Sequence, residues 1–547
     1  MTNISIDETF KSALAKIGVN EDISIEFETP KNEDHGDIST NIAMKLAKPL
    51  KKQPRIIAGE IIENLEFDPE IIEKCEIAGP GFINIKFLPK FFHENLAGLI
   101  ELGENIGKSE AGKGIKVNVE YVSANPTGLL HLGHGRNACI GDTVANLFEW
   151  TGHEVTREYY FNNAGNQMNN LAKSIFARYM QKYVDKDHSF PEDGYHGEYV
   201  IEIADKVHEI HGDSFRDENE SNLKICAKLG EEWCFERISQ TLDKLHIKQD
   251  VFYNEDTLYS EGKIDAVIEE LKAKDLAYEK DGATWFKLTE LGLDDDRVIV
   301  KSTGEPTYRL PDIAYHREKF KRGFDIIVDV FGADHIATVP DVLAGVKALG
   351  YDTDAVKVLI HQFVTLTEAG QQIKMSKRSG KSYTLDDLID EVGAEVVRFF
   401  LLMRGISTHL EFDLALAREQ SDKNPVFYLQ YAHARISSIL EKAREGEIEL
   451  IDNADLSLLQ HKTEIDLIKK LMKFDAVLIH AVKKMEPQVI AEYLKELASS
   501  FHQFYHECRI IGTVENLQAA RLNLALITKL ALKNGLSIMG VSAPNKM

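Results

Sequence analysis

The sequence predicts an α/β protein whose central part is a doubly wound parallel sheet. Three observations lead to this prediction. A buried-strand pattern at residues 115–122 is followed by a turn, a helix and a second strand at 154–161. The segment before it mixes helical and alternating patterns over about one small domain. From residue 425 onward only long amphipathic helical patterns occur, which predicts a separate all-helical part.

Length and composition are those of a multidomain globular protein. The chain has 547 residues, of which 44% are hydrophobic and 28% charged, and this excludes collagen-like, disulfide-scaffold and wholly disordered classes. The net charge of −24 argues against a polyanion partner for the chain as a whole. Residues 426–547, however, carry 15 Lys+Arg against 14 Asp+Glu, so this part can approach a polyanion without net repulsion.

The chain shows no signal-peptide pattern and no run of about 20 apolar residues. Its cysteines contain no C-x-x-C pair, which argues against a disulfide framework and against a zinc knuckle. They are Cys75, Cys139, Cys226, Cys234 and Cys508. We therefore expect a cytoplasmic, reduced protein with no membrane association and no protein-bound zinc.

Residues 1–110 predict a small α/β domain. Residues 45–62 have helical spacing, and residues 82–87 (FINIKF) alternate as in a strand after an Ala-Gly-Pro-Gly turn. The small, polar stretch 107–114 is a plausible linker to the next domain.

Residues 111–380 predict the main α/β domain. The order strand 115–122, turn 123–128, helix 131–150 and strand 154–161 is a βαβ unit, which favours a parallel, Rossmann-like sheet. Residues 166–276 are mostly helical and polar, and we expect them to be an insertion. Strand-like apolar runs return afterwards, at 297–301, 325–330 and 355–360.

Residues 381–425 are expected to connect this domain to an all-helical domain at 426–547. Residues 385–403 have helical spacing. Thr384 is the expected N-cap, and Asp387, three residues later, forms a variant of the capping box.

The tetrapeptide His131-Leu-Gly-His134 stands where the first strand's turn meets the helix. There the unpaired N–H groups and the positive end of the helix dipole favour phosphate, and imidazole N–H groups can donate to it. We expect Gly133 and Gly135 to leave room for the ligand. Two histidines at this spacing could also bind a metal or cap the helix. The segment is not the metal-binding motif H-E-x-x-H, because Leu132 stands where that motif has Glu. The chain contains neither a Walker loop nor G-x-G-x-x-G.

The second motif, Lys374-Met-Ser-Lys-Arg378, puts three cations and a hydroxyl on a glycine-flanked loop. Such a loop suits a leaving pyrophosphate, whose charge grows in the transition state; the alternative is a solvated basic loop. Both motifs would open on the carboxyl edge of a doubly wound sheet, where ligands bind.

Together these two motifs resemble the HIGH and KMSKS signatures of class I aminoacyl-tRNA synthetases. Longer stretches resemble the arginyl-tRNA synthetase family in particular, in the same order and over nearly the whole chain. They are residues 120–134, 160–167, 332–335 and 427–435, and residues 32–37 and 79–84 in an N-terminal module peculiar to that family.

The resemblance implies two reactions: arginine and ATP give arginyl-adenylate and pyrophosphate, and arginine then passes to the terminal 2′-hydroxyl of tRNA(Arg). It implies that tRNA must bind before activation, that the enzyme is a monomer without a DNA partner, and that Mg²⁺ accompanies ATP without a protein metal site. It assigns catalysis to His131, His134, Lys374 and Lys377, and ATP binding to these residues with Leu132, Gly133, Gly135, Met375 and Ser376.

The resemblance also places an arginine pocket on Glu120, Ser123, Asn125, Tyr308 and Asp312. A guanidinium presents five N–H donors in a planar fork, so carboxylates and amide oxygens suit it. We expect Asp312 to take the guanidinium, with Tyr308 orienting it from the same helix face. Glu120 and Asn125 would then bracket the α-amino and carboxylate ends.

Transfer RNA contacts are expected in both flanking domains. In the N-terminal module Phe82 would stack on a D-loop base and Asn84 would read its edge, unless Phe82 packs in its own core. In the C-terminal helices Tyr431, His433 and Arg435 would approach the anticodon, although aromatic residues at helical spacing are often core residues.

Three other kinds of interpretation compete, and the first is a different class I specificity. A cysteinyl synthetase would need zinc ligands, and a glutamyl synthetase would need a cationic pocket. A small nucleotidyltransferase shares the H-x-G-H site but lacks a long helical domain. A synthetase-like RNA-binding protein without ligase activity is the non-enzyme alternative, and the intact pair of motifs argues against it.

Overall fold

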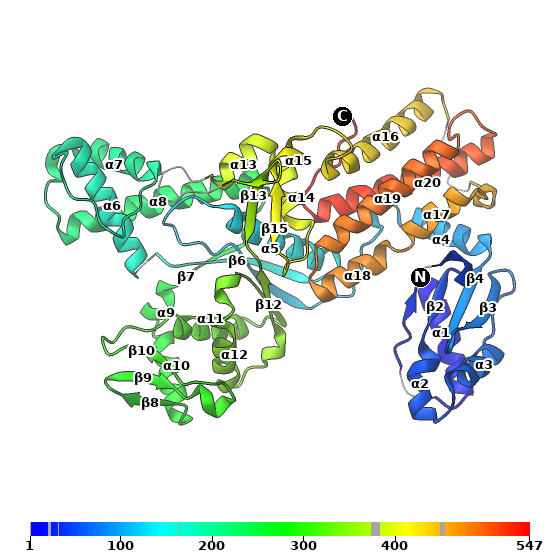
Figure 1. The fold of residues 1–547 in the computed structure, drawn as a ribbon, viewed down its shortest axis with the longest axis horizontal. Helices are drawn as coiled ribbons and strands as arrows, with labels where there is room; N and C mark the ends of the chain where they lie inside the picture. The colour runs from blue at the N-terminus through cyan, green and yellow to red at the C-terminus, as the bar shows by residue number, and fades with distance from the viewer. Residues whose placement is uncertain (1, 20–22, 31, 164, 374–382, 449–453) are drawn as a thin grey trace.

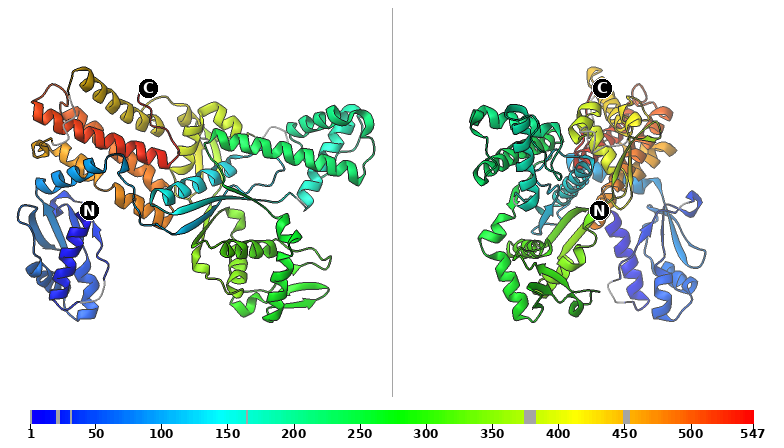
Figure 2. Two further views of the ribbon diagram at one scale, coloured as in Figure 1. Left: turned by 180° about the vertical axis from the view of Figure 1, so that it is seen from behind. Right: turned by 60° about the vertical axis from the view of Figure 1, so that its left-hand side comes forward.

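The computed structural model describes residues 2–19, 23–30, 32–163, 165–373, 383–448 and 454–547. The central parallel sheet lies in the middle of an elongated molecule (Figure 1). A helical arm extends from it to one side, and the C-terminal helices extend to the other, with the N-terminal domain below them (Figure 2).

The N-terminal domain packs helices against an antiparallel sheet with strand order β1-β2-β4-β3. The strand expected at 82–87 is confirmed as β4. The single helical pattern at 45–62 forms two helices instead, because Lys51 takes a left-handed conformation (φ 50°) and Pro54 begins the next helix. The elements are α1 (Thr2–Lys16), β1 (Phe27–Glu28), β2 (Ile38–Thr40), α2 (Ile42–Leu50), α3 (Pro54–Asn64), β3 (Ile72–Ala78) and β4 (Phe82–Phe87).

The central sheet confirms the predicted doubly wound α/β fold. Its five strands pair in parallel in the order β12-β11-β5-β6-β7. Helix α5 crosses from β5 to β6 on one face, and α11 packs its polar side chains on the other. The elements are β5 (Lys116–Glu120), α5 (Leu132–Trp150), β6 (Glu154–Phe161), β7 (Val251–Asn254), α11 (Arg309–Lys321), β11 (Ile326–Gly332) and β12 (Val356–His361).

The segment expected to be an insertion at 166–276 is only partly one. Its first part forms the helical arm with its own apolar core, but Val251–Asn254 is β7, the edge strand of the central sheet. Four residues are too few for an alternating pattern, so only pairing with β6 reveals the strand. The helices of the segment are α6 (Gly165–Tyr183), α7 (Glu198–His211), α8 (Glu220–Lys244), α9 (Asp256–Ser260) and α10 (Lys263–Ala273).

The strand expected at 297–301 forms, but it belongs to a small antiparallel sheet and not to the parallel one. This sheet is made of β8 (Ala277–Lys280), β9 (Ala283–Phe286) and β10 (Arg297–Val300), and α12 (Val339–Ala348) follows β11. A third sheet follows β12 and consists of β13 (Val364–Glu368), β14 (Gln371–Gln372) and β15 (Leu410–Asp413).

The helix expected at 385–403 is divided into α13 (Leu385–Val392) and α14 (Ala394–Leu402), since Gly393 between them has φ 86°. Thr384 and Asp387 form the reciprocal capping box that the sequence indicates.

The described residues after 425 contain helices and no strands, as the sequence predicts. Among the described residues, none of the helices is long and apolar enough to cross a membrane. The C-terminal helices, preceded by the short α15 (Leu414–Arg418), are α16 (Pro425–Glu445), α17 (Lys462–Leu471), α18 (Phe474–Lys484), α19 (Gln488–Glu507) and α20 (Glu515–Ile538).

One buried arginine joins three parts of the molecule. Arg398 of α14 is fully buried, and its guanidinium forms an ion pair with Asp142 of α5. It also donates to the carbonyl of Leu245, directly after α8, at 2.7 Å and to that of Met539, at the end of α20, at 3.0 Å. The N-terminal domain is attached separately, through α4 (Pro89–Leu102) packed on α17 and the 2.6 Å ion pair between Asp37 and Lys469.

We expect Arg398→Met to destabilise the protein by about 3–5 kcal/mol, because the buried Asp142 carboxylate then keeps only a 3.9 Å contact to Arg157 and a 3.4 Å contact to Asn146. Urea unfolding followed by circular dichroism measures the change. Arg418→Met is the control, since Arg418 forms its ion pairs at the surface and its loss should barely move the midpoint. Equal shifts for both variants would contradict the role assigned to Arg398.

Candidate active site at the carboxyl edge of the parallel sheet

The loop after β5 is strained and held in place by α5. Val122 (φ 68°) and Ser123 (φ 43°) both lie in the left-handed region, which is costly for residues with a side chain. The Val122 N–H donates to the Asn137 side chain at 2.6 Å, and the Asn137 amide donates to the Val330 carbonyl at 2.7 Å. Asn137, which the sequence analysis missed, thus fixes the loop to the neighbouring strand.

The two histidines of the HIGH-like motif form the N-terminus of α5. His131 is the N-cap, and the Nδ1 atom of each ring accepts the other residue's backbone N–H at 3.3 Å. Their rings stack with centroids 3.7 Å apart. Because both Nδ1 atoms accept, each neutral ring carries its proton on Nε2. Burial, with His131 and His361 nearby, lowers the pKa of His134 to about 3, so this ring is a neutral donor at pH 7.

The glycines of this turn act differently from expectation. A Cβ atom on Gly135 would lie 2.7 Å from Leu385 Cδ1, so this buried glycine allows α13 to pack against α5. The expectation that Gly135 leaves room for a ligand is therefore wrong. A Cβ atom on Gly133 would lie 2.9 Å from the His131 ring, which indicates that Gly133 permits the stacked histidines. Leu132 is buried, so only its backbone can face a ligand.

The second motif lies outside the described residues. The motif comes after the β13–β14 hairpin in the sequence and contains Lys374, Met375, Ser376 and Lys377. The next described residue is Tyr383, just before α13. Their assignment to ATP and pyrophosphate remains a prediction.

Three carboxylates lie side by side across the central sheet. Glu120 of β5 is in register with Asp329 of β11 on one side and with Glu158 of β6 on the other. All three are buried. Like charges at neighbouring positions of one sheet face repel one another, so this row requires cations close by.

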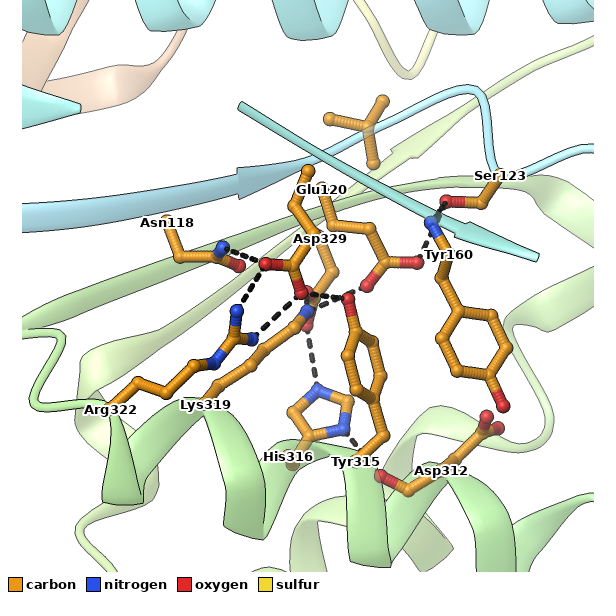
Figure 3. A network of polar contacts seen from close by, with 12 residues as sticks. Asn118, Glu120, Ser123, Tyr160, Asp312, Tyr315, His316, Lys319, Arg322 and Asp329 are labelled. Carbon is orange, nitrogen blue, oxygen red and sulfur yellow. Dashed lines mark hydrogen bonds and ion pairs between the residues drawn. The ribbon is translucent and has the colours of Figure 1, made fainter. Parts of the chain in front are cut away.

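Helix α11 and Arg322, which follows its last residue, supply those cations (Figure 3). Lys319 Nζ lies 2.6 Å from Glu120 Oε2 and 2.6 Å from Asp329 Oδ1. His316 Nε2 lies 2.8 Å from the other Asp329 oxygen. Arg322 and the Tyr315 hydroxyl both bind Glu158. The signal in the sequence is His, Lys and Arg at every third position from 316 to 322, which the sequence analysis passed over.

Electrostatics in this network favour ionised pairs. Burial disfavours the imidazolium, but the Asp329 carboxylate outweighs it and holds the pKa of His316 above its usual value. Burial also opposes the charge on Asp329, yet Lys319 and His316 hold its pKa well below its usual value. For Glu120, burial raises the pKa although Lys319 opposes the shift. The cations on the α11 side of the sheet thereby compensate most of the negative charge of the three carboxylates.

Asp312, one turn before His316, is different. In the part of the chain that the structure describes, its carboxylate has no lysine or arginine partner. Burial raises the pKa of Asp312 to about 7, and the carboxylates of Glu120 and Glu255 add to the effect while His316 opposes it. A site with an unpaired carboxylate of this kind favours a cationic ligand.

Glu255 is a further residue that the sequence analysis missed, because it lies within the supposed insertion. It directly follows β7, at the carboxyl edge, and the Tyr160 hydroxyl donates to it at 2.8 Å. Burial raises its pKa too. Because the four-residue strand β7 shows no pattern of its own, no local signal in the sequence pointed to Glu255.

The structure brings Glu120, Ser123 and Asp312 together at this edge (Figure 3). The Ser123 hydroxyl donates to Glu120 Oε1 at 2.9 Å. Asn125 lies further along the same loop and donates to Gln167 Oε1 at 2.9 Å. Tyr308 directly precedes α11, and its side chain is 82% exposed to solvent; its contact with arginine stays a prediction.

The RNA-binding candidates lie in different environments. Asn84 is buried and accepts a 2.7 Å hydrogen bond from Ser39, although it borders a polar depression lined also by His35 and Lys86. Phe82 is half-buried at the start of β4. Contact of Phe82 and Asn84 with RNA stays a prediction.

In the C-terminal domain Tyr431 is 44% exposed, and the Arg435 guanidinium lies 5.0 Å from its ring centre. His433 is only 1% exposed, and its Nδ1 lies 2.8 Å from the Pro544 carbonyl. The prediction that His433 faces the anticodon is wrong for this structure, because the C-terminal tail covers that face of α16.

Comparison with known proteins agrees with this geometry. The family model for the class I (R) tRNA synthetase catalytic domain matches residues 99–399, which is more than half of the chain. The arginyl-tRNA synthetase N-terminal domain matches residues 5–87, and the DALR anticodon binding domain matches residues 429–547.

A curated arginine–tRNA ligase of Salinibacter ruber is 50% identical over 546 residues, which cover 97% of each chain. A solved structure from Campylobacter jejuni, assigned as an arginyl-tRNA synthetase, is 33% identical with a TM-score of 0.77 over 84% of this chain and 100% of its own. The Thermus thermophilus arginyl-tRNA synthetase, at 21% identity, shares the fold with a TM-score of 0.79 over the full length of both chains. The chain belongs to the arginyl-tRNA synthetase family, within the class I aminoacyl-tRNA synthetases.

Proposed function

We propose that this chain, an arginine–tRNA ligase by its family, binds arginine between Asp312 and Glu120 and ATP at the N-terminus of α5. The observation that carries this assignment is the unpaired Asp312 carboxylate at the carboxyl edge, with Glu255 as a second carboxylate nearby. A guanidinium entering there would meet two acceptors that no described lysine or arginine already neutralises.

The amino acid lies with its guanidinium at Asp312 and Glu255 and its α-ammonium at Glu120. The α-carboxylate then points toward Asn125 and the start of α5, where ATP binds. Lysine is rejected because its point charge cannot satisfy both acceptors that a planar fork satisfies. Such rejection by unpaired polar groups can reach about 10⁴-fold without an editing site.

In the first step an oxygen of the arginine carboxylate attacks the α-phosphorus of ATP, and pyrophosphate leaves. The Nε2–H groups of His131 and His134 donate to phosphate oxygens, and the N-terminus of α5 favours the growing negative charge. Lys374 and Lys377 hold the leaving pyrophosphate. Mg²⁺ would arrive with ATP and be held mostly by phosphates and water.

In the second step the terminal 2′-hydroxyl of tRNA(Arg) attacks the carbonyl carbon of the adenylate, and AMP leaves. We assign residues 1–110 to the D-loop of tRNA and 426–547 to its anticodon, with 111–380 catalytic and 381–425 contacting the tRNA stem. Phe82, Tyr431 and Arg435 are the most exposed contacts of this proposal. The enzyme acts as a cytoplasmic monomer and requires tRNA for activation.

ATP–pyrophosphate exchange with each of the twenty amino acids, with and without total tRNA, tests this function. We expect exchange with arginine alone, and only when tRNA is present. Exchange with another amino acid would contradict the pocket assignment, and arginine exchange without tRNA would contradict the tRNA requirement. A folded protein without any exchange would favour an RNA-binding role.

Asp312→Asn should lower kcat/KM for arginine by about 30-fold to several thousand-fold, because a desolvated charge pair is worth about 2–5 kcal/mol. The KM for ATP should change little. The same exchange assay measures both constants. Asp265→Asn, an exposed carboxylate on α10, is the control and should leave both unchanged. A parallel rise in the KM for ATP would place Asp312 outside the arginine pocket.

The pKa of Asp312 predicts an acid limb in the pH profile. Its value in the folded enzyme is raised to about 7, so below that pH the carboxyl is neutral and cannot pair with a guanidinium. We expect kcat/KM for arginine to fall as the pH drops below about 7. The limb should vanish in Asp312→Asn, measured over pH 5.5–8.5, whereas an unchanged limb in the variant would assign it to another group.

A further inference from the structure

Lys319 lies completely buried beneath the arginine pocket, on the face of α11 that is turned to the sheet (Figure 3). A fully buried lysine is rare and needs partners. Two of its three N–H donors go to Glu120 and Asp329, each at 2.6 Å, and the ammonium lies 4.4 Å from the Tyr315 ring centre. No step of the proposed reaction involves this lysine.

The contacts of Lys319 determine the position of the Glu120 carboxylate. Oε2 accepts from Lys319 at 2.6 Å, and Oε1 accepts from the Ser123 hydroxyl at 2.9 Å. Both oxygens are thus fixed from the protein side, yet each carboxylate oxygen can accept a second hydrogen bond from the pocket. Ser123 itself is held by the strained turn after β5.

The two ends of the pocket therefore differ in charge. Glu120 shares a cation with Asp329, whereas Asp312 and Glu255 have no lysine or arginine partner among the described residues. A guanidinium is a weakly hydrated planar fork that gains most from unpaired carboxylates. An ammonium is a compact donor that can also bind a carboxylate already paired with a lysine. Charge alone thus distinguishes the two cationic ends of one arginine molecule.

We propose that Lys319 is a positioning and specificity residue: it holds and partly neutralises Glu120 as the acceptor for the α-ammonium, and so directs the guanidinium to Asp312 and Glu255. This inference rests on the arginine pocket proposed above. Lys319 touches no substrate and acts only through Glu120. It would set the direction in which the amino acid lies and thereby turn its carboxylate toward ATP.

The test compares L-arginine with 5-guanidinopentanoate, which has the guanidinium and carboxylate but lacks the α-amino group. The KM for arginine and the inhibition constant of the analogue are measured in tRNA-supported pyrophosphate exchange. In Lys319→Met we expect the KM for arginine to rise about ten- to hundredfold, the range for one lost charged hydrogen bond. The analogue's constant should change less than threefold.

Folding is controlled by a second variant. Lys319→Met combined with Asp329→Asn removes one cation and one carboxylate, so that the net charge of the buried network is kept, although His316 loses its 2.8 Å contact to Asp329. The double variant should show the same loss of discrimination between the two ligands. Lys263→Met is the matched control. Lys263, on α10, pairs with Glu318 of α11, the helix that carries Lys319, and not with Glu120. It should leave the ratio of the two constants unchanged.

A purely structural lysine would lower the melting temperature and weaken both ligands alike, and that result in the folded double variant would overturn the inference. Unchanged arginine affinity in either variant would overturn it as well. Glu120→Gln distinguishes a wrong pocket from a wrong role of Lys319. If Glu120→Gln leaves the ratio unchanged, the proposed pocket is wrong. If Glu120→Gln abolishes the discrimination between arginine and the analogue while the lysine variants keep it, the pocket stands and the role of Lys319 is refuted.

Discussion

The row of buried carboxylates across β11, β5 and β6 is the constraint on which the rest of the site depends. Asp329, Glu120 and Glu158 are brought together by the sheet register, and their repulsion would be severe without cations. Helix α11 meets this need with cationic side chains at successive turns. The packing of α11 on the sheet is therefore electrostatic as well as apolar, and it positions Asp312 at the pocket.

Helix α5 covers the opposite face of the sheet and meets a different requirement. Helix α5 must present its N-terminus to a ligand while its body stays buried. The two stacked histidines satisfy each other's backbone N–H groups and keep their Nε2 atoms as donors. Asn137 of the same helix holds the strained turn that follows Glu120. One helix thus fixes the proposed phosphate-binding end and one wall of the proposed arginine pocket.

The outer domains are joined to this centre by a small set of polar contacts. Arg398 connects α5 to the ends of the arm helix α8 and of the C-terminal helix α20. The N-terminal domain reaches the same C-terminal domain through α4 and the Asp37–Lys469 pair. Both proposed tRNA-binding domains are connected to each other and to α5. A bound tRNA would therefore have a fixed position relative to the proposed adenylate site.

The sequence by itself determined the order of the parts, the strands at 82–87 and 154–161, the Thr384–Asp387 cap and the two signature motifs. These depend on residues close together in the chain, where periodicity and capping chemistry are decided. Only the tertiary structure decided that Val251–Asn254 joins the central sheet, that Gly135 serves packing and that His433 is covered. The same holds for the partner of Glu120, since Lys319 is 199 positions away. Burial, strand register and charge compensation arise between segments distant in the chain, and no local pattern specifies them.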